Sequence, residues 1–88
     1  MKLEEVLVKI NNEQVMLNFL KDIATPQELK SLQERLDIAI LLNGGMSYSA
    51  ISKETGASTT TITRISRFLK QESYGGYRWI LENLNVVK

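Results

Sequence analysis

The stretch ISKETGASTTTITRISRFL, residues 51–69, has hydroxyl side chains at five of the six positions from Ser58 to Thr63. These positions otherwise have the pattern of a helix start. Threonine is a mediocre helix former, because its branched β-carbon loses rotamer freedom against the preceding turn. Helix stability therefore does not explain the run of threonines, and a functional use of these hydroxyls is indicated.

The residues around this run predict two helices joined by a four-residue turn. Ser47 can cap a first helix, Tyr48–Thr55, and Ser58 can cap the second. Apolar side chains recur in the second helix at helical spacing and form one inward stripe, made of Ile62, Ile65 and Leu69. The opposite side of this helix then faces solvent. The residues on that side or at its edge are Thr59, Thr60, Thr63, Arg64 and Arg67.

A small residue, a glycine and several apolar residues would let these two helices cross closely at a steep angle. They are Ser52, Gly56, Ile51, Ala57, Ile62 and Ile65. In a helix-turn-helix, the second helix presents its N-terminal residues to base edges in the major groove, while the first helix crosses the DNA backbone. Hydroxyls bond phosphates or base edges, and basic side chains supply a salt-dependent attraction. The residues expected to contact double-stranded DNA are Ser47, Ser49, Lys53, Ser58, Thr59, Thr60, Thr61, Thr63, Arg64, Arg67 and Lys70.

A plainer interpretation stays open on these residues alone. Ser58 could serve only as a cap, the threonines could form a solvated face, and the arginines could pair with acids such as Glu54. The chain could then be a helical protein-interaction module that does not bind DNA. We favour DNA because the charge is unevenly distributed: residues 46–70 hold four basic and one acidic side chain, whereas residues 1–45 hold five basic and seven acidic.

The 88-residue chain has neither cysteine nor histidine. A disulfide framework and a thiolate metal site are therefore excluded, and the commonest general acid or base near neutral pH is missing. We expect no enzyme activity, no metal and no cofactor. No segment approaches the roughly 18 apolar residues of a membrane helix, and Glu4 and Glu5 argue against a signal peptide, so a cytoplasmic protein is expected.

The rest of the chain also has helical periodicity. Two short amphipathic helices are indicated by Leu3, Val6, Leu7 and Ile10, and by Met16, Phe19, Leu20 and Ile23. Thr25, Pro26 and Glu28 then form a strong start for a long helix, which Asn43, Gly44 and Gly45 stop. A last helix is marked by Tyr77, Ile80, Leu81 and Leu84. The prediction is an all-α fold with residues 1–88 in one domain and the helix-turn-helix at about 47–70.

Three segments resemble the Trp repressor superfamily, in particular its YerC/YecD-like branch. They are TPQELKSLQER (25–35), GMSYSAISKETGASTTTITRISRFLK (45–70) and YGGYRWIL (74–81). The resemblance implies six helices per chain, an intertwined symmetric homodimer, and DNA binding through two helix-turn-helix units as a transcriptional repressor. A dimer is also expected because the predicted helices offer more apolar surface than one thin core can hide. Trp79 lies off the apolar stripe of the last helix, and we interpret it as core or interface.

In the tryptophan-responsive member, the resemblance implies a corepressor held between the long helix and the second helix of the motif. Its arginine and threonine contacts correspond here to Arg35, Arg64, Thr25 and Thr61. However, the position of the glycine that admits the indole is occupied here by Ile65. The position of a serine that meets the ligand's amino group is occupied by Phe68. These larger side chains would fill the slot and leave the ligand's ammonium unpaired, so we expect no tryptophan binding. A regulator that senses another small molecule near Arg35 and Arg64 is the alternative.

Overall fold

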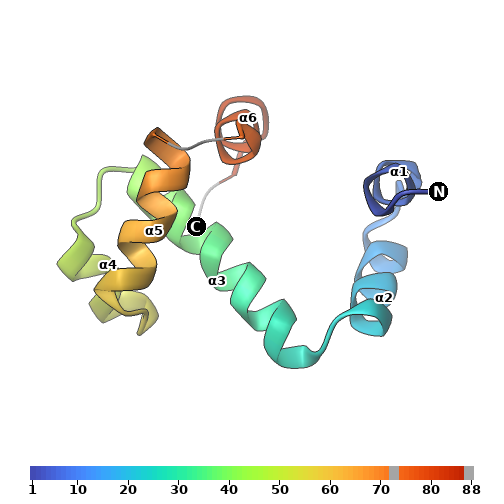
Figure 1. Cartoon of the computed structure of the whole chain (residues 1–88), viewed down its shortest axis with the longest axis horizontal. Coiled ribbons are helices and arrows are strands. Elements are labelled where there is room, and N and C mark those ends of the chain that lie inside the picture. Colours follow the sequence, from blue (N-terminus) through green and yellow to red (C-terminus); the bar gives the residue numbers. More distant parts are fainter. Residues whose placement is uncertain (72–73, 87–88) are drawn as a thin grey trace. The chain divides into compact units, whose positions relative to one another are not determined.

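The structure is a computed structural model that describes residues 1–71 and 74–86 (Figure 1). Its helices are α1 (Leu3–Lys9), α2 (Glu13–Ile23), α3 (Pro26–Asn43), α4 (Tyr48–Thr55), α5 (Thr59–Lys70) and α6 (Gly76–Asn83). No strand occurs in these residues, so the all-α prediction is confirmed. Contacts divide the chain into two compact units, Met1–Ser31 and Leu32–Lys88. A single domain over residues 1–88 stays a prediction.

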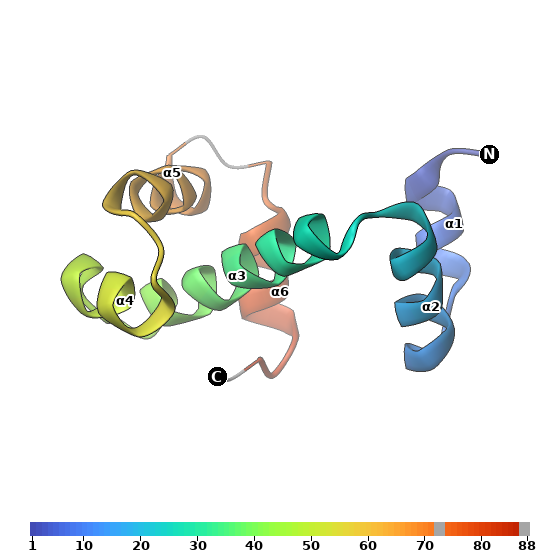
Figure 2. The same cartoon turned by 90° about the horizontal axis from the view of Figure 1, so that it is seen from below.

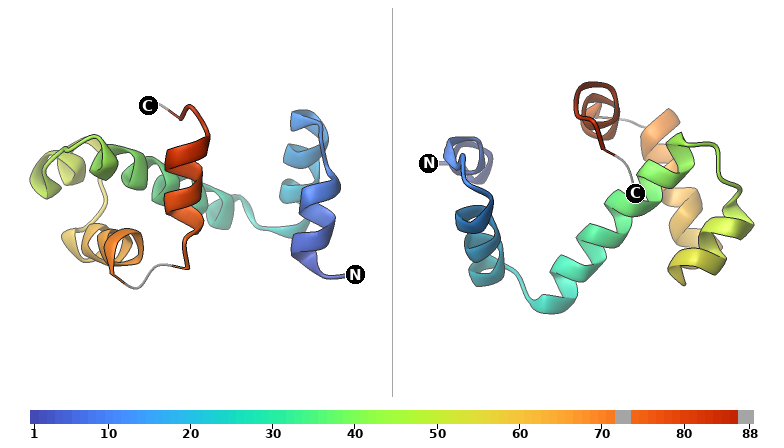
Figure 3. Two further views of the ribbon diagram at one scale, coloured as in Figure 1. Left: turned by 90° about the horizontal axis from the view of Figure 1, so that it is seen from above. Right: turned by 180° about the vertical axis from the view of Figure 1, so that it is seen from behind.

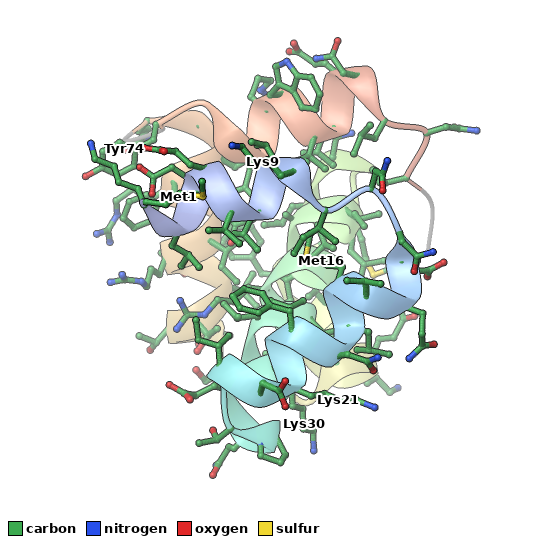
Figure 4. All side chains as sticks on the ribbon, turned by 90° about the vertical axis from the view of Figure 1, so that its right-hand side faces the viewer. Met1, Lys9, Met16, Lys21, Lys30 and Tyr74 are labelled. Atoms are coloured by element: carbon green, nitrogen blue, oxygen red, sulfur yellow. The ribbon has the colours of Figure 1, made fainter. Side chains whose placement is uncertain are left out.

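The first unit contains α1 and α2, and neither helix has a fully buried residue. α2 begins after Asn12, whose side chain accepts a hydrogen bond from the Val15 N–H at 3.0 Å. Figure 4 shows the side chains of both helices, with Lys9 on α1 and Lys21 on α2. Large apolar side chains are exposed on this unit, namely Leu3, Val8, Val15, Leu17 and Ile23. One copy of the chain therefore leaves much of their apolar surface uncovered.

The predicted capping box stands at the start of α3. The Glu28 N–H donates to Thr25 Oγ1 at 3.1 Å, and the Thr25 N–H donates to Glu28 Oε1 at 2.8 Å. Two interactions with Thr25 lower the pKa of Glu28 below its ordinary value of 4.5. The larger contribution comes from the Thr25 backbone N–H, and the smaller comes from the Thr25 hydroxyl. α3 ends at Asn43, and Gly45 follows with a φ of 88°, a conformation that favours glycine.

The buried core lies in the second unit, where α3 meets α4 and α5 (Figure 2). Its members come from α3, from α4, from the turn and from α5: Ile38, Ala39, Ile51, Ala57, Ile62 and Ile65. Burying one isoleucine contributes about 1.5–3 kcal/mol, so the isoleucines of this cluster favour the packing of α5 against α3 and α4. Leu69 is the further apolar side chain that is buried among the described residues. The core is thin, as a chain of this length predicts.

The last helix, α6, is in contact with α5, and both views of Figure 3 show the two near each other. Tyr77 packs against the core cluster, and Arg78 Nη2 donates to the Leu69 carbonyl at 3.3 Å. Leu84, which marked this helix in the sequence, has an extended backbone and forms the C-cap after Asn83. Trp79 is 57% exposed in the single chain, so it is not a core residue. Its predicted place in an interface stays a prediction.

Candidate nucleic-acid interface

The α4–α5 pair begins and ends where the sequence predicts. Ser47 Oγ accepts the Ala50 N–H at 3.1 Å, and Ser58 Oγ accepts the Thr61 N–H at 3.2 Å. Gly56 ends α4 with a φ of 79°, a left-handed backbone conformation that glycine adopts without the strain that residues with a Cβ carry there. Two short capped helices joined at a glycine form the arrangement expected of a helix-turn-helix.

The turn is also tied by two hydroxyl side chains whose bonds the sequence did not predict. Ser52 Oγ donates to the Ala57 carbonyl at 2.7 Å. Thr55 Oγ1 donates to the Ile51 carbonyl at 2.7 Å and accepts the Ala57 N–H at 3.1 Å. Serine and threonine make such local bonds next to turns, and this tendency is the signal that could have indicated them. The bonds fix the turn, so that α5 is presented in one orientation relative to α4.

The two faces of α5 are divided as predicted, with Ile62, Ile65 and Leu69 buried. Thr61 is half-buried and its Oγ1 lies 3.1 Å from Ser58 Oγ, so it is less accessible to a DNA duplex than its exposed neighbours. The other predicted contact residues are exposed together on the same pair of helices: Ser47, Ser49, Lys53, Ser58, Thr59, Thr60, Thr63, Arg64, Arg67 and Lys70.

Four of these exposed residues are cations, namely Lys53, Arg64, Arg67 and Lys70. Within residues 1–71 and 74–86, none of the four lies within 4.0 Å of a carboxylate oxygen in an ion pair. Their charge is therefore not neutralised by the described part of the chain, and it remains available to an anionic partner.

The two arginines expected near a small-molecule site do line a common pocket. This pocket of about 260 Å³ is bounded by Arg35, Thr61, Arg64, Ile65, Phe68 and Tyr77. The Arg64 guanidinium lies 5.1 Å from the centroid of the Phe68 ring, and that ring stacks with Tyr74 at 6.4 Å between centroids and 14° between planes. Ile65 is 3% exposed and belongs to the core. Arg64 thus meets an aromatic ring that the protein itself supplies.

A second, larger hollow lies along α6. This apolar groove of about 600 Å³ is lined by Leu36, Phe68, Tyr74, Gly76, Tyr77, Trp79 and Ile80. Tyr74 is 97% exposed within the single chain. Exposed apolar surface of this extent is typical of an interface. A third, polar pocket lies beside Tyr48 and Ser66 on the α4–α5 pair.

In the part of the chain that the structure describes, acidic side chains nowhere gather in the groups of three that could hold a metal ion. The helices of that part include none long and apolar enough to cross a lipid bilayer.

Comparison with known proteins gives one family. A family model described as Trp repressor protein matches residues 1–85. The uncharacterized protein YerC of Bacillus subtilis (strain 168) is 47% identical over 51 residues, which cover 58% of this chain and 49% of YerC. The chain therefore spans about half the length of this curated relative.

Two solved structures share the fold. The crystal structure of a TrpR-like protein from Eubacterium eligens ATCC 27750 matches with a TM-score of 0.89 and 30% identity, over 98% of this chain and 88% of that one. A candidate Trp repressor from Staphylococcus aureus matches with a TM-score of 0.87 and 32% identity, over 98% of this chain and 85% of the other.

Proposed function

Because this chain belongs to the Trp repressor family, we propose that it is a sequence-specific DNA-binding repressor of transcription. Proteins of this family are regulators and not enzymes. The observation that carries the proposal is the exposed N-terminal half of α5, where Thr59, Thr60 and Thr63 lie on the same pair of helices as four exposed cations that form no ion pair with the described residues. A cytoplasmic location, where bacterial DNA lies, is part of the proposal.

The exposed residues take different roles in this proposal. Thr60 and Thr63, on the solvent side of α5, contact base edges, because the second helix of the motif enters the major groove by its N-terminal residues. Lys53 and Lys70 contact phosphates, which hold the protein on DNA without reading its sequence.

Binding to duplex DNA at several salt concentrations tests the proposal. We expect the affinity for mixed-sequence DNA to fall as salt rises, because each phosphate contact releases counterions. A helical protein-interaction module that docks by apolar contact need not show this dependence. Selection of bound fragments from a genomic pool then supplies an operator, and an absence of enriched sequences would contradict sequence specificity.

Two sets of variants distinguish the recognition of bases from the electrostatic attraction to phosphates. Thr60→Ala and Thr63→Ala should reduce the preference for operator over random DNA. Lys70→Ala should weaken both affinities similarly and reduce the dependence of log affinity on log salt by about one unit. Equal effects from all three variants would contradict the assigned roles.

A homodimer is the second part of the proposal. The apolar groove along α6 and the exposed apolar side chains of α1 and α2 are surfaces that a second copy of the chain would cover. Two helix-turn-helix units would then meet two half-sites about one helical turn of DNA apart.

Regulation without tryptophan is the third part. Ile65 is buried in the core, and Phe68 is engaged by Arg64 and Tyr74, so this side of α5 already carries apolar groups of the protein. We expect free tryptophan to give no calorimetric heat of binding at millimolar concentration and no change in DNA affinity. Saturable tryptophan binding would contradict this.

The pocket beside Arg35 and Arg64 favours one alternative, a regulator that senses another small molecule. Its two cations would suit a carboxylate, and Thr61 and Tyr77 add hydroxyls to the same pocket. A panel of small carboxylates in a thermal-shift assay, with Arg35→Gln as the control variant, tests it. Stabilisation of the unmodified protein but not of Arg35→Gln would support this alternative.

A further inference from the structure

A polar pocket lies where the start of α4 meets the outer face of α5. It has a volume of about 230 Å³ and is lined by Tyr48, Thr63, Ser66, Arg67, Lys70 and Gln71. Four of these residues, at positions 63, 66, 67 and 70, follow the i, i+3, i+4, i+7 spacing that puts side chains on one face of a helix. Tyr48 is the first residue of α4 and closes the pocket from the other helix. We call this the Tyr48 pocket.

The lining of the Tyr48 pocket suits an anion. Arg67, Lys70 and Gln71 bring N–H donors and Tyr48, Thr63 and Ser66 bring hydroxyls, and the described residues that line the pocket include no carboxylate. Arg67 and Lys70 also lie in the last turn of α5, where cations stabilise the C-terminal end of a helix. Helix stabilisation explains their charge, but it does not explain a pocket in which hydroxyls from two helices converge beside them.

Inside the pocket, Tyr48 Oη donates to Ser66 Oγ at 2.7 Å. Ser66 is 5% exposed, whereas Tyr48 is 39% exposed. Of the two bonded residues, Tyr48 is therefore the one that solvent or a ligand can reach. Both groups can donate or accept. When an anion arrives, Ser66 can become the donor to Tyr48 Oη, which frees the phenol hydrogen for the anion. The bond therefore holds the Tyr48 side chain in place, and the phenol hydrogen can still be donated to an anion.

We propose that the Tyr48 pocket receives one phosphate group of the DNA backbone, with Arg67 and Lys70 as the charged contacts and Tyr48 as a neutral donor. The inference rests on the proposed DNA binding and deepens it. Its location agrees with a helix-turn-helix, whose first helix crosses the backbone while the second occupies the groove. Thr63 lines the pocket and also belongs to the exposed face of α5, so the phosphate contact adjoins the surface that reads bases.

Two variants that break the same bond test the role of Tyr48. Tyr48→Phe removes the phenol hydroxyl, whereas Ser66→Ala removes its partner and leaves the hydroxyl free to donate. We expect Tyr48→Phe to weaken binding to a mixed-sequence duplex about tenfold, the value of one hydrogen bond to a charged group. Ser66→Ala should stay within about twofold of the unmodified protein. Tyr48→Phe should leave the salt dependence unchanged, because it removes no charge.

Equal losses in the two variants would mean that the bond only positions α4, and unchanged affinity in Tyr48→Phe would mean that the phenol touches no phosphate. Either result overturns the proposal while leaving DNA binding intact. Melting midpoints of both variants, measured in parallel, show whether a loss comes from unfolding. Arg67→Gln and Lys70→Gln should each lower the salt slope by about one, whereas Lys21→Gln, an equal change of charge on α2, should not.

A second arm uses inorganic phosphate and no DNA. Amide NMR signals of Ser66, Arg67 and Lys70 should shift saturably with phosphate, but not with chloride at equal ionic strength. The shifts should vanish in the double variant Arg67→Gln/Lys70→Gln. Shifts that never saturate would overturn the pocket as a phosphate site. Saturable phosphate binding in a protein that fails to bind DNA would overturn the DNA backbone as the source and contradict the proposed function.

Discussion

At the scale of single residues, the ionised carboxylate of Glu28 is stabilised by a hydrogen bond in the capping box that it forms with Thr25. The Thr25 N–H donates to Glu28 Oε1 at 2.8 Å, and this bond, with the Thr25 hydroxyl, lowers the pKa of Glu28 below 4.5. A carboxyl whose pKa is lower in the folded than in the unfolded chain stabilises the fold above its unfolded pKa. The contribution is lost as the pH falls through the lower, folded value.

We therefore predict that Glu28→Gln flattens the acid side of the stability curve. The amide keeps an acceptor oxygen for the cap but cannot ionise, so its contribution does not change between pH 6 and pH 3. The unmodified protein should be the more stable at neutral pH, and the difference in thermal midpoint should shrink as the pH falls below about 4.5. Melting curves at fixed protein concentration measure this. A constant difference across the range would show that Glu28 does not contribute to the acid dependence.

The caps show which single-residue features the sequence predicts. Thr25, Ser47 and Ser58 each bond the N–H three residues further on, so the whole interaction lies within one short stretch of sequence. The bond from Tyr48 to Ser66 joins residues 18 apart, and the bond from Arg78 ends on a carbonyl of another helix. Such bonds depend on how helices cross, which no local pattern specifies, and the sequence did not predict them.

At the scale of elements, the α4–α5 turn depends on one glycine. Gly56 has a φ of 79°, and a Cβ built there would meet no atom within 4 Å. A substitution at this position is therefore opposed by backbone strain and not by crowding. The hydroxyl bonds of Ser52 and Thr55 hold the same turn, so the strain cannot be relieved without breaking them.

Gly56→Ala is predicted to destabilise the fold by about 1–2 kcal/mol, and Gly56→Asn by less, because asparagine tolerates the left-handed region better. Gly44→Ala is the matched control: a Cβ there lies at ordinary contact distance, 3.5 Å from the Leu41 carbonyl oxygen, and no positive φ is involved. Its effect should stay within about 0.5 kcal/mol. Urea unfolding at one protein concentration gives these values. Equal losses for the two alanine variants would argue against strain at Gly56.

The elements themselves follow closely from hydrophobic spacing, as the positions of α1 to α6 show. The buried stripe of α5 was predicted because Ile62, Ile65 and Leu69 recur with the period of the helix. The pockets were not, since each needs side chains from separate elements: Tyr48 and Lys70 meet in one, Arg35 and Phe68 in another. Only the family resemblance brought Arg35 and Arg64 together in advance, and their use remains a prediction.

At the scale of the whole molecule, burial is concentrated in the second unit. Every buried apolar side chain of the described residues lies between Ile38 and Leu69, and none lies in α1, α2 or α6. Those three helices nevertheless carry exposed large apolar residues, Trp79 among them. A chain of this size buries only about 60% of its unfolded surface by itself, so association is the expected way to cover the remainder.

Our last prediction concerns that association. At low micromolar concentration, light scattering should give twice the 10.0 kDa mass of one chain, and the thermal midpoint should rise with protein concentration because dissociation accompanies unfolding. Trp79, the single tryptophan, lines the apolar groove, so its fluorescence should shift to shorter wavelength as dimer forms. Trp79→Lys should raise the dissociation constant, because a charge would be buried at the interface, whereas Thr60→Ala on the DNA face should leave it unchanged. A mass of one chain, with a midpoint and a Trp79 emission that do not depend on concentration, would refute the dimer and leave the apolar groove without an occupant.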